Sequence, residues 1–116
     1  MKQIILALAM AIGLSSFVYP QDSSADVFKS SEFLKWPAKS QAFYFRTSIG
    51  MAGLVAGRND KKQGKCIDDW YFATQDKANA HILSVMQKHP AFHPRGVILA
   101  VLEKQCGKLI YTNTKG

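Results

Sequence analysis

Acidic residues, histidine and cysteine are all scarce in this sequence. Its 116 residues include eight Asp and Glu, three His and two Cys. A chain this short cannot form a (β/α)8 barrel or a doubly wound nucleotide-binding sheet, which need far more residues. It also lacks a glycine-rich phosphate loop, a nucleophile elbow and closely spaced paired glutamates, the usual marks of several enzyme classes. We therefore predict one small domain that is not an enzyme and needs no cofactor.

The histidines do not form a metal-binding pattern. His89 and His93 are four residues apart, but Pro90 and Pro94 interrupt the helix that would place both side chains on one face. His81 stands alone. We expect no metal site.

The charge is strongly positive, with fifteen Lys and Arg and a net charge of +7. These basic residues are dispersed along the chain instead of forming a nucleic-acid-binding motif. The charge therefore favours an acidic protein partner or an anionic envelope surface, and we expect no nucleic-acid partner.

The N-terminus has the features of a secretory signal peptide. A short basic start at Met1–Gln3 precedes an apolar run from Ile4 to Leu14, which is too short to span a bilayer. Small residues at Ser23–Ala25 suggest cleavage before Asp26, although a cut nearer Ser15 or Ser16 stays open. We predict a signal peptide over 1–25 and a single mature domain over 26–116 that does not insert into a membrane. The expected location is the periplasm, with full secretion as the alternative.

The two cysteines, Cys66 and Cys106, both fall in the predicted mature domain. In an oxidising compartment, an even pair in a small domain indicates a disulfide. A bridge between residues 40 apart lowers the entropy of the unfolded chain, which stabilises the fold by about 4 kcal/mol. A reactive or metal-binding thiol is the alternative, but no base or further ligand set accompanies either cysteine.

Apolar residues recur at helical spacing through most of the mature chain, which predicts an all-α bundle of about four helices. The helices are expected from Pro37 to about Gly57, from Thr74 to just before Pro90, and from Pro94 to Cys106, with Gly107 ending the last one. A short turn over 33–36, capped by Ser30 or Ser31, precedes them, and a leader docks through Phe28. Gly50 and Gly53 suggest that a neighbouring backbone packs closely against the first long helix.

Two segments lack this spacing. Residues 57–65, GRNDKKQGK, are rich in turn formers and charge, and predict a solvated loop. The aromatic residues 70–72 that follow are expected to cover the core instead of forming a platform on which ligands stack. A short extended piece is expected over 109–111.

The order of these parts resembles the Rap/Tai family of periplasmic immunity proteins, which inhibit peptidoglycan amidases delivered by type VI secretion. The resemblance covers about residues 31–107. It lies in the small-residue helix SIGMAGLVAG (48–57), a Cys before an aromatic-rich turn, a Thr-capped helix ending at Lys-His-Pro (88–90), and GVILAVLEKQCG (96–107). The chain lacks the further Cys that the family often carries in the small-residue helix, and the Phe-Pro that often precedes the last Cys.

The resemblance implies an all-α inhibitor that binds and blocks a cognate amidase toxin, and it leaves a homodimer open. We expect the surface that contacts the toxin to lie in the predicted loop over residues 57–65, with contacts from Arg58, Asn59, Asp60, Lys61 and Lys62. The turn over residues 90–94 is the alternative. A periplasmic stress or chaperone-like protein, or another envelope interaction protein, is the rival hypothesis.

Overall fold

The computed structural model describes residues 27–110, and within that range every regular element is a helix. The predicted signal peptide, its cleavage site and Tyr111 lie outside the described residues. A short helix, α2, precedes four longer ones, which confirms the all-α prediction. The helices are α2 (Ser30–Phe33), α3 (Ala38–Asn59), α4 (Lys61–Phe72), α5 (Gln75–Lys88) and α6 (Pro94–Cys106).

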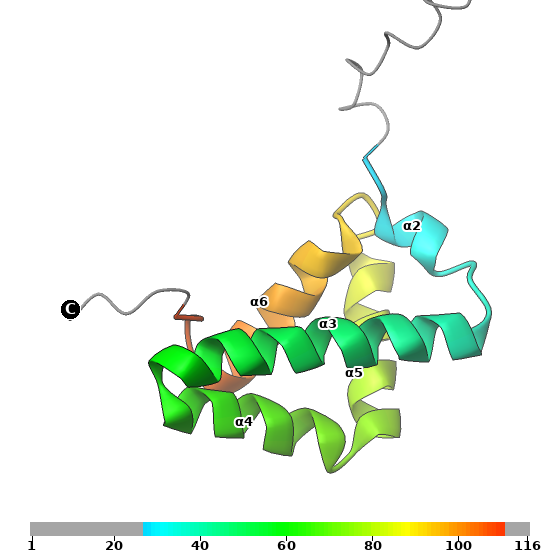
Figure 1. The fold of residues 1–116 in the computed structure, drawn as a ribbon. Coiled ribbons are helices and arrows are strands. Elements are labelled where there is room, and N and C mark those ends of the chain that lie inside the picture. Colours follow the sequence, from blue (N-terminus) through cyan, green and yellow to red (C-terminus); the bar gives the residue numbers. More distant parts are fainter. Residues whose placement is uncertain (1–26, 111–116) are drawn as a thin grey trace, which may run out of the picture.

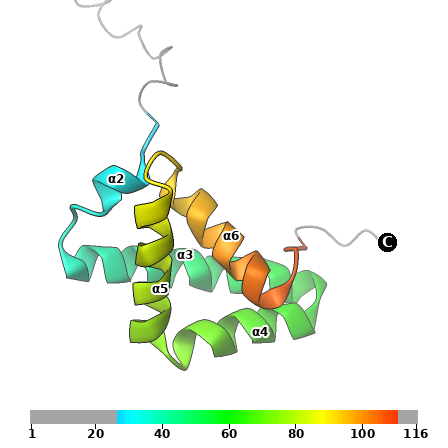
Figure 2. The same cartoon turned by 180° about the vertical axis from the view of Figure 1, so that it is seen from behind.

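The helices form two layers (Figure 1). Helices α3 and α4 lie side by side and antiparallel, and theirs is the most extensive contact between any two helices. Helices α5 and α6 form a V behind them, and α2 lies beside the turn that joins the two arms (Figure 2). The core fills the space between the layers. Its largest fully buried side chains are Tyr71, Phe33, Phe45, Ile49, Ile67, Ile82, Met86, Ile98 and Leu102.

The predicted loop over 57–65 is wrong, because α3 continues to Asn59 and α4 begins at Lys61. Asp60 alone links them, and its carboxylate accepts hydrogen bonds from the backbone N–H groups of Lys62 and Gln63. The turn formers in this stretch therefore mark a helix cap and not a loop. Its lysines lie on the exposed side of α4, while Gly64, Ile67 and Tyr71 on the opposite side are buried. This spacing of three and four residues is helical.

Close backbone packing is centred one turn beyond the glycines from which we predicted it, although it also includes the Gly53 carbonyl, 3.0 Å from a Cβ placed on Gly64. A Cβ atom on Gly64 of α4 would lie only 2.5 Å from the Cα of Gly57 in α3. At Gly53 the neighbours are side chains, those of Asp68 and Ile67, and at Gly50 the nearest is the ring of Phe72 at 4.0 Å. The hairpin is thus closest near its turn.

The aromatic segment after Cys66 forms the second half of α4. Tyr71 is fully buried, and its hydroxyl donates to Asn79 Oδ1 at 2.7 Å. Trp70 is partly buried against the core, whereas Phe72 is 41% exposed. The expectation that these residues cover the core is therefore correct for Trp70 and Tyr71, and wrong for much of Phe72.

The start of the described chain is attached to the turn between α5 and α6. Ser30 is fully buried, and both its backbone N–H and its hydroxyl donate to the carbonyl of Phe92 at 2.8 Å. Lys29, and not Ser30 or Ser31, is the N-cap of α2, and its N–H donates to the Glu32 carboxylate. Phe28 stacks on Trp36 with 5.3 Å between ring centroids, so it docks as predicted.

The last two long helices begin and end almost where the sequence predicts. Pro94 is the first residue of α6, and Gly107 follows its end with a φ of 89°. His93 caps α6 through its Nδ1 atom, which accepts from the Arg95 N–H at 3.0 Å. Thr74 occupies the N-cap position of α5, but its side chain makes no capping hydrogen bond to that helix. Its hydroxyl donates to the Trp70 carbonyl of α4.

Two further properties concern the described residues only. None of their helices is both long and apolar enough to cross a bilayer. No three His, Cys, Asp or Glu side chains among residues 27–110 are placed to hold a metal ion together.

Candidate binding surface

The five residues predicted to contact a partner lie at the corner where α3 meets α4, and two of them build the corner itself. Asp60 caps α4 as described above. Asn59 donates from its side-chain Nδ2 to the carbonyls of Val55 and Ile110, each at 3.2 Å. Both side chains therefore stabilise this end of the hairpin, which makes them poor candidates for direct partner contacts.

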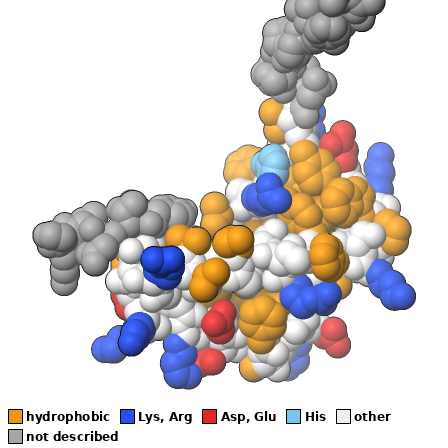
Figure 3. Space-filling view, in the orientation of Figure 1, with side chains coloured by type: hydrophobic (Ala, Val, Ile, Leu, Met, Phe, Trp, Pro, Cys, Tyr) orange, Lys and Arg blue, Asp and Glu red, His pale blue; other side chains and the backbone are white. Residues whose placement is uncertain are grey.

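The other three, Arg58, Lys61 and Lys62, are exposed cations on either side of Asp60. We call them the corner cations. Blue side chains project from this end of the hairpin in Figure 3, whereas hydrophobic side chains gather toward α2. Arg58 lies in the last turn of α3, and the two lysines are the first two residues of α4. The corner thus presents three positive charges from two helices that meet at a single residue.

A shallow hollow next to the corner has mixed charge. Its charged lining residues are Arg58 and Lys61 of the corner together with Lys65, Asp68 and Asp69, and the side chain of Leu54, 62% exposed, lies beside them. The Lys65 ammonium pairs with the Asp69 carboxylate at 2.7 Å, and this hydrogen bond and charge raise the pKa of Lys65. Along α4, therefore, the lysines without a carboxylate partner are the two at its start, Lys61 and Lys62, whereas Lys65 is paired.

The Cys66–Cys106 disulfide lies behind this surface and confirms the predicted pairing. Its Cα atoms are 5.8 Å apart, and it joins the second turn of α4 to the last residue of α6. The bridge therefore fixes the corner against the second layer of the fold.

Sequence reasoning missed Gln63, which is the most highly connected polar residue near the corner. Its side-chain Nε2 is within hydrogen-bond distance of three carbonyls, those of Cys106, Gly107 and Lys108. Its Oε1 accepts from the backbone N–H of Ile110 at 3.0 Å. A buried glutamine must satisfy its amide, and Gln63 does so by holding the chain after α6 against α4. Only its place four residues before Ile67, on the buried side of a helix, could have indicated this role.

Comparison of the chain with protein-family models, with curated proteins and with solved structures finds no match in any of the three. The candidate surface is therefore defined by its own geometry. It is a rigid, cationic corner held by one helix cap, one disulfide and one buried amide, and this arrangement suits it to bind an acidic surface.

Proposed function

We propose that the protein is a periplasmic immunity protein of the Rap/Tai type, which binds and blocks a secreted peptidoglycan amidase through the corner cations. The resemblance of residues 31–107 to that family supplies the class of target. The disulfide supports export to an oxidising compartment. The three exposed cations supply the contact.

The position of Lys61 and Lys62 is the observation that carries this proposal. They are the first two residues of α4, and no acidic residue occupies the first turn of that helix. The N-terminus of a helix carries a partial positive charge, so a cation there is unfavourable and a carboxylate would be favourable. Two lysines at this place do not serve the stability of α4. An acidic partner would give them a role, because it would pair with both lysines, while Asp60 already caps the helix end.

The rigidity of the corner favours inhibition by binding. A loop that must be ordered on binding subtracts that cost from the affinity. Here the linker is one residue long and the helix after it is bridged to α6. The corner can therefore meet a partner in its free conformation.

The proposal is tested by co-expression with the enzyme encoded by the neighbouring reading frame, scored by survival and by the dissociation constant of the purified pair. The double substitution Lys61→Glu, Lys62→Glu should weaken binding at least tenfold and abolish protection. It should leave the melting temperature nearly unchanged, because carboxylates suit the start of α4 but these two would also lie beside the Asp60 carboxylate.

The matched control is Lys35→Glu, Lys39→Glu. Both lysines are exposed, and they lie at the opposite end of α3 from the corner. This pair changes the net charge by the same amount, so it should weaken binding far less if the corner is the contact. Equal weakening by both pairs would show that overall charge and not the corner attracts the enzyme. An unchanged dissociation constant for the corner variant would remove the corner from the interface.

The chaperone-like alternative predicts a different outcome. It is favoured by the exposed apolar side chains of α3, which include Phe43, Met51 and Leu54. In that case the protein should suppress aggregation of many unrelated denatured proteins and should not protect against one enzyme.

A further inference from the structure

An apolar groove runs between α3 and α6, on a part of the molecule that the corner does not use. Its volume is about 440 Å³, within the range typical of small-molecule sites. From α3 it is lined by Met51, Ala52, Val55 and Ala56, from α6 by Ile98 and Leu99, and beyond α6 by Leu109 and Ile110. Met51 is 61% exposed, so this apolar surface is open to solvent.

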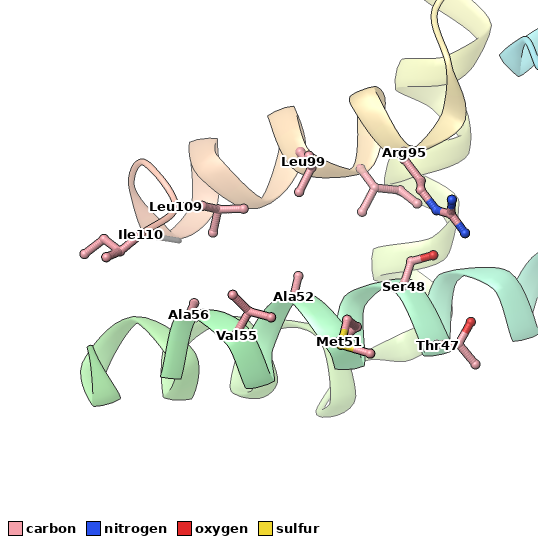
Figure 4. Close-up of a pocket in the computed structure, with 11 residues that line it drawn as sticks. Thr47, Ser48, Met51, Ala52, Val55, Ala56, Arg95, Leu99, Leu109 and Ile110 are labelled. Carbon is pink, nitrogen blue, oxygen red and sulfur yellow. The ribbon is translucent and has the colours of Figure 1, made fainter. Parts of the chain in front are cut away.

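The polar groups of the groove are all at one end. Thr47, Ser48 and Arg95 lie at the end toward α2, whereas Leu109 and Ile110 lie at the other (Figure 4). The guanidinium of Arg95 is 5.2 Å from the centre of the Tyr44 ring, and this contact holds it at the mouth of the groove. The groove is therefore apolar along most of its length and carries a positive charge at one end.

The charge at that end is not neutralised by the residues around it. The groove lining contains no carboxylate, and the adjoining hollow, which shares Thr47 and Arg95, adds Lys39 and no acidic residue. Among residues 27–110, the one salt bridge is that of Lys65 with Asp69, on α4. Arg95 is exposed and thus available to an anion.

We infer that this groove binds a small amphiphile of the fatty-acid class, with its carboxylate at Arg95 and its alkyl chain along α3 toward Ile110. A mostly apolar cleft with a few polar groups at one place is the usual form of a site that fixes a ligand's orientation. A second copy of the chain fits less well, because a two-fold interface places the same patch on both sides. That pairing would offer Arg95 no carboxylate, because the groove lining of neither copy contains one.

The first experiment is calorimetric titration of the disulfide-bonded protein with straight-chain carboxylates from eight to fourteen carbons, below the concentrations at which they form micelles. Each added methylene that the groove buries should raise the affinity about fourfold. The gain should stop once the chain reaches the Ile110 end, at one ligand per protein. An affinity that rises without limit, or many ligands per chain, would show nonspecific adsorption and overturn the inference.

The second experiment tests the head group with dodecanoate, dodecanol and dodecyltrimethylammonium, which share one alkyl length. Dodecanoate should bind at least fivefold more tightly than the alcohol and more tightly still than the cation. Arg95→Glu should reverse the order of the two charged ligands. Equal affinity for all three would contradict an oriented carboxylate at Arg95.

A matched pair of variants on α3 tests the location. Met51→Glu places a charge in the groove, whereas Leu54→Glu places it at a side chain of equal exposure outside the groove lining. Met51→Glu should reduce the affinity for dodecanoate at least tenfold, and Leu54→Glu should leave it within twofold. If Leu54→Glu weakened binding and Met51→Glu did not, the ligand site would lie outside the groove. Sedimentation that shows a dimer broken by Met51→Glu alone would assign the groove to a second copy. The two groove variants, Met51→Glu and Arg95→Glu, leave the corner cations unchanged, so protection against the amidase is tested separately.

Discussion

Gly57 of α3 and Gly64 of α4 face each other across the helix hairpin with no side chain between their backbones. A Cβ built on Gly64 would lie 2.5 Å from Gly57 Cα, 2.9 Å from Gly57 N and 3.0 Å from the Gly53 carbonyl oxygen. All three are backbone atoms, which cannot move aside as the end of a flexible side chain can. The closeness of the two helices therefore depends on this pair.

Gly64→Ala should separate α3 from α4 and lower the free energy of unfolding by about 1–3 kcal/mol, the usual cost of overpacking. This loss should exceed the gain in helix propensity that alanine brings. Urea denaturation measures the net change in the free energy of unfolding. The control is Gly96→Ala in α6, where a Cβ would meet nothing within 4 Å. That variant should raise stability by about 0.5–1 kcal/mol. A neutral or stabilising Gly64→Ala would show that the two backbones can separate without cost.

Replacing both Cys66 and Cys106 by alanine should lower the free energy of unfolding by about 4 kcal/mol, because the bridge closes a span of 40 residues. Denaturation with and without reductant provides the measurement. The native protein should lose stability on reduction, whereas the double variant should be insensitive to the reductant. A native protein that keeps its full stability after reduction would contradict this role of the bridge.

Gln63→Leu should release the chain after α6 from α4. It removes the bonds to three carbonyls and to the Ile110 N–H, so we expect a loss of about 1–3 kcal/mol. Hydrogen exchange gives a sharper test. The Ile110 amide should exchange much faster, while the Leu109 amide, which donates to Glu103 Oε2, should change less. Gln105→Leu, at an exposed position, should alter stability by at most about 0.5 kcal/mol.

Burial raises the pKa of Tyr71 above its usual range, although the Asn79 hydrogen bond opposes this shift. The folded protein thus favours the neutral phenol. Its contribution to stability is complete below the unfolded pKa of about 10 and is lost as the pH rises through the higher folded pKa. The free energy of unfolding should therefore fall above pH ~10, and less steeply in Tyr71→Phe. Denaturation between pH 8 and pH 11 checks this, and identical slopes would contradict it.

The sequence predicted the helices that are bounded by strong local signals. Pro94 and Gly107 mark the two ends of α6, and Pro90 lies just beyond α5, because the backbone of each residue type restricts where a helix can begin or end. The cysteine pair likewise predicted its own bridge. These features depend on one or two residues each.

The start of α4 could not be predicted in the same way. Aspartate is favoured both in turns and at helix N-caps, and the close contact of Gly64 with Gly57 that accompanies the helical arrangement is not visible in the sequence. The roles of Gln63 and Ser30 also depend on carbonyls far away in the sequence, those after α6 and that of Phe92. Consequently the sequence indicated which charged residues lie together at the corner, but not that they belong to two helices joined at Asp60.

The attachment of Ile110 determines where a probe can be placed on this molecule. Its backbone is hydrogen-bonded to both Asn59 and Gln63, so any group joined soon after it begins beside the corner cations. Phe28, by contrast, packs against Trp36, which precedes α3. The start of α3 and the neighbouring α2 lie at the end of the fold away from the corner (Figure 1). A fluorophore or affinity handle joined at Ile110 would therefore crowd the proposed enzyme-binding surface, whereas one joined at Phe28 would leave it accessible.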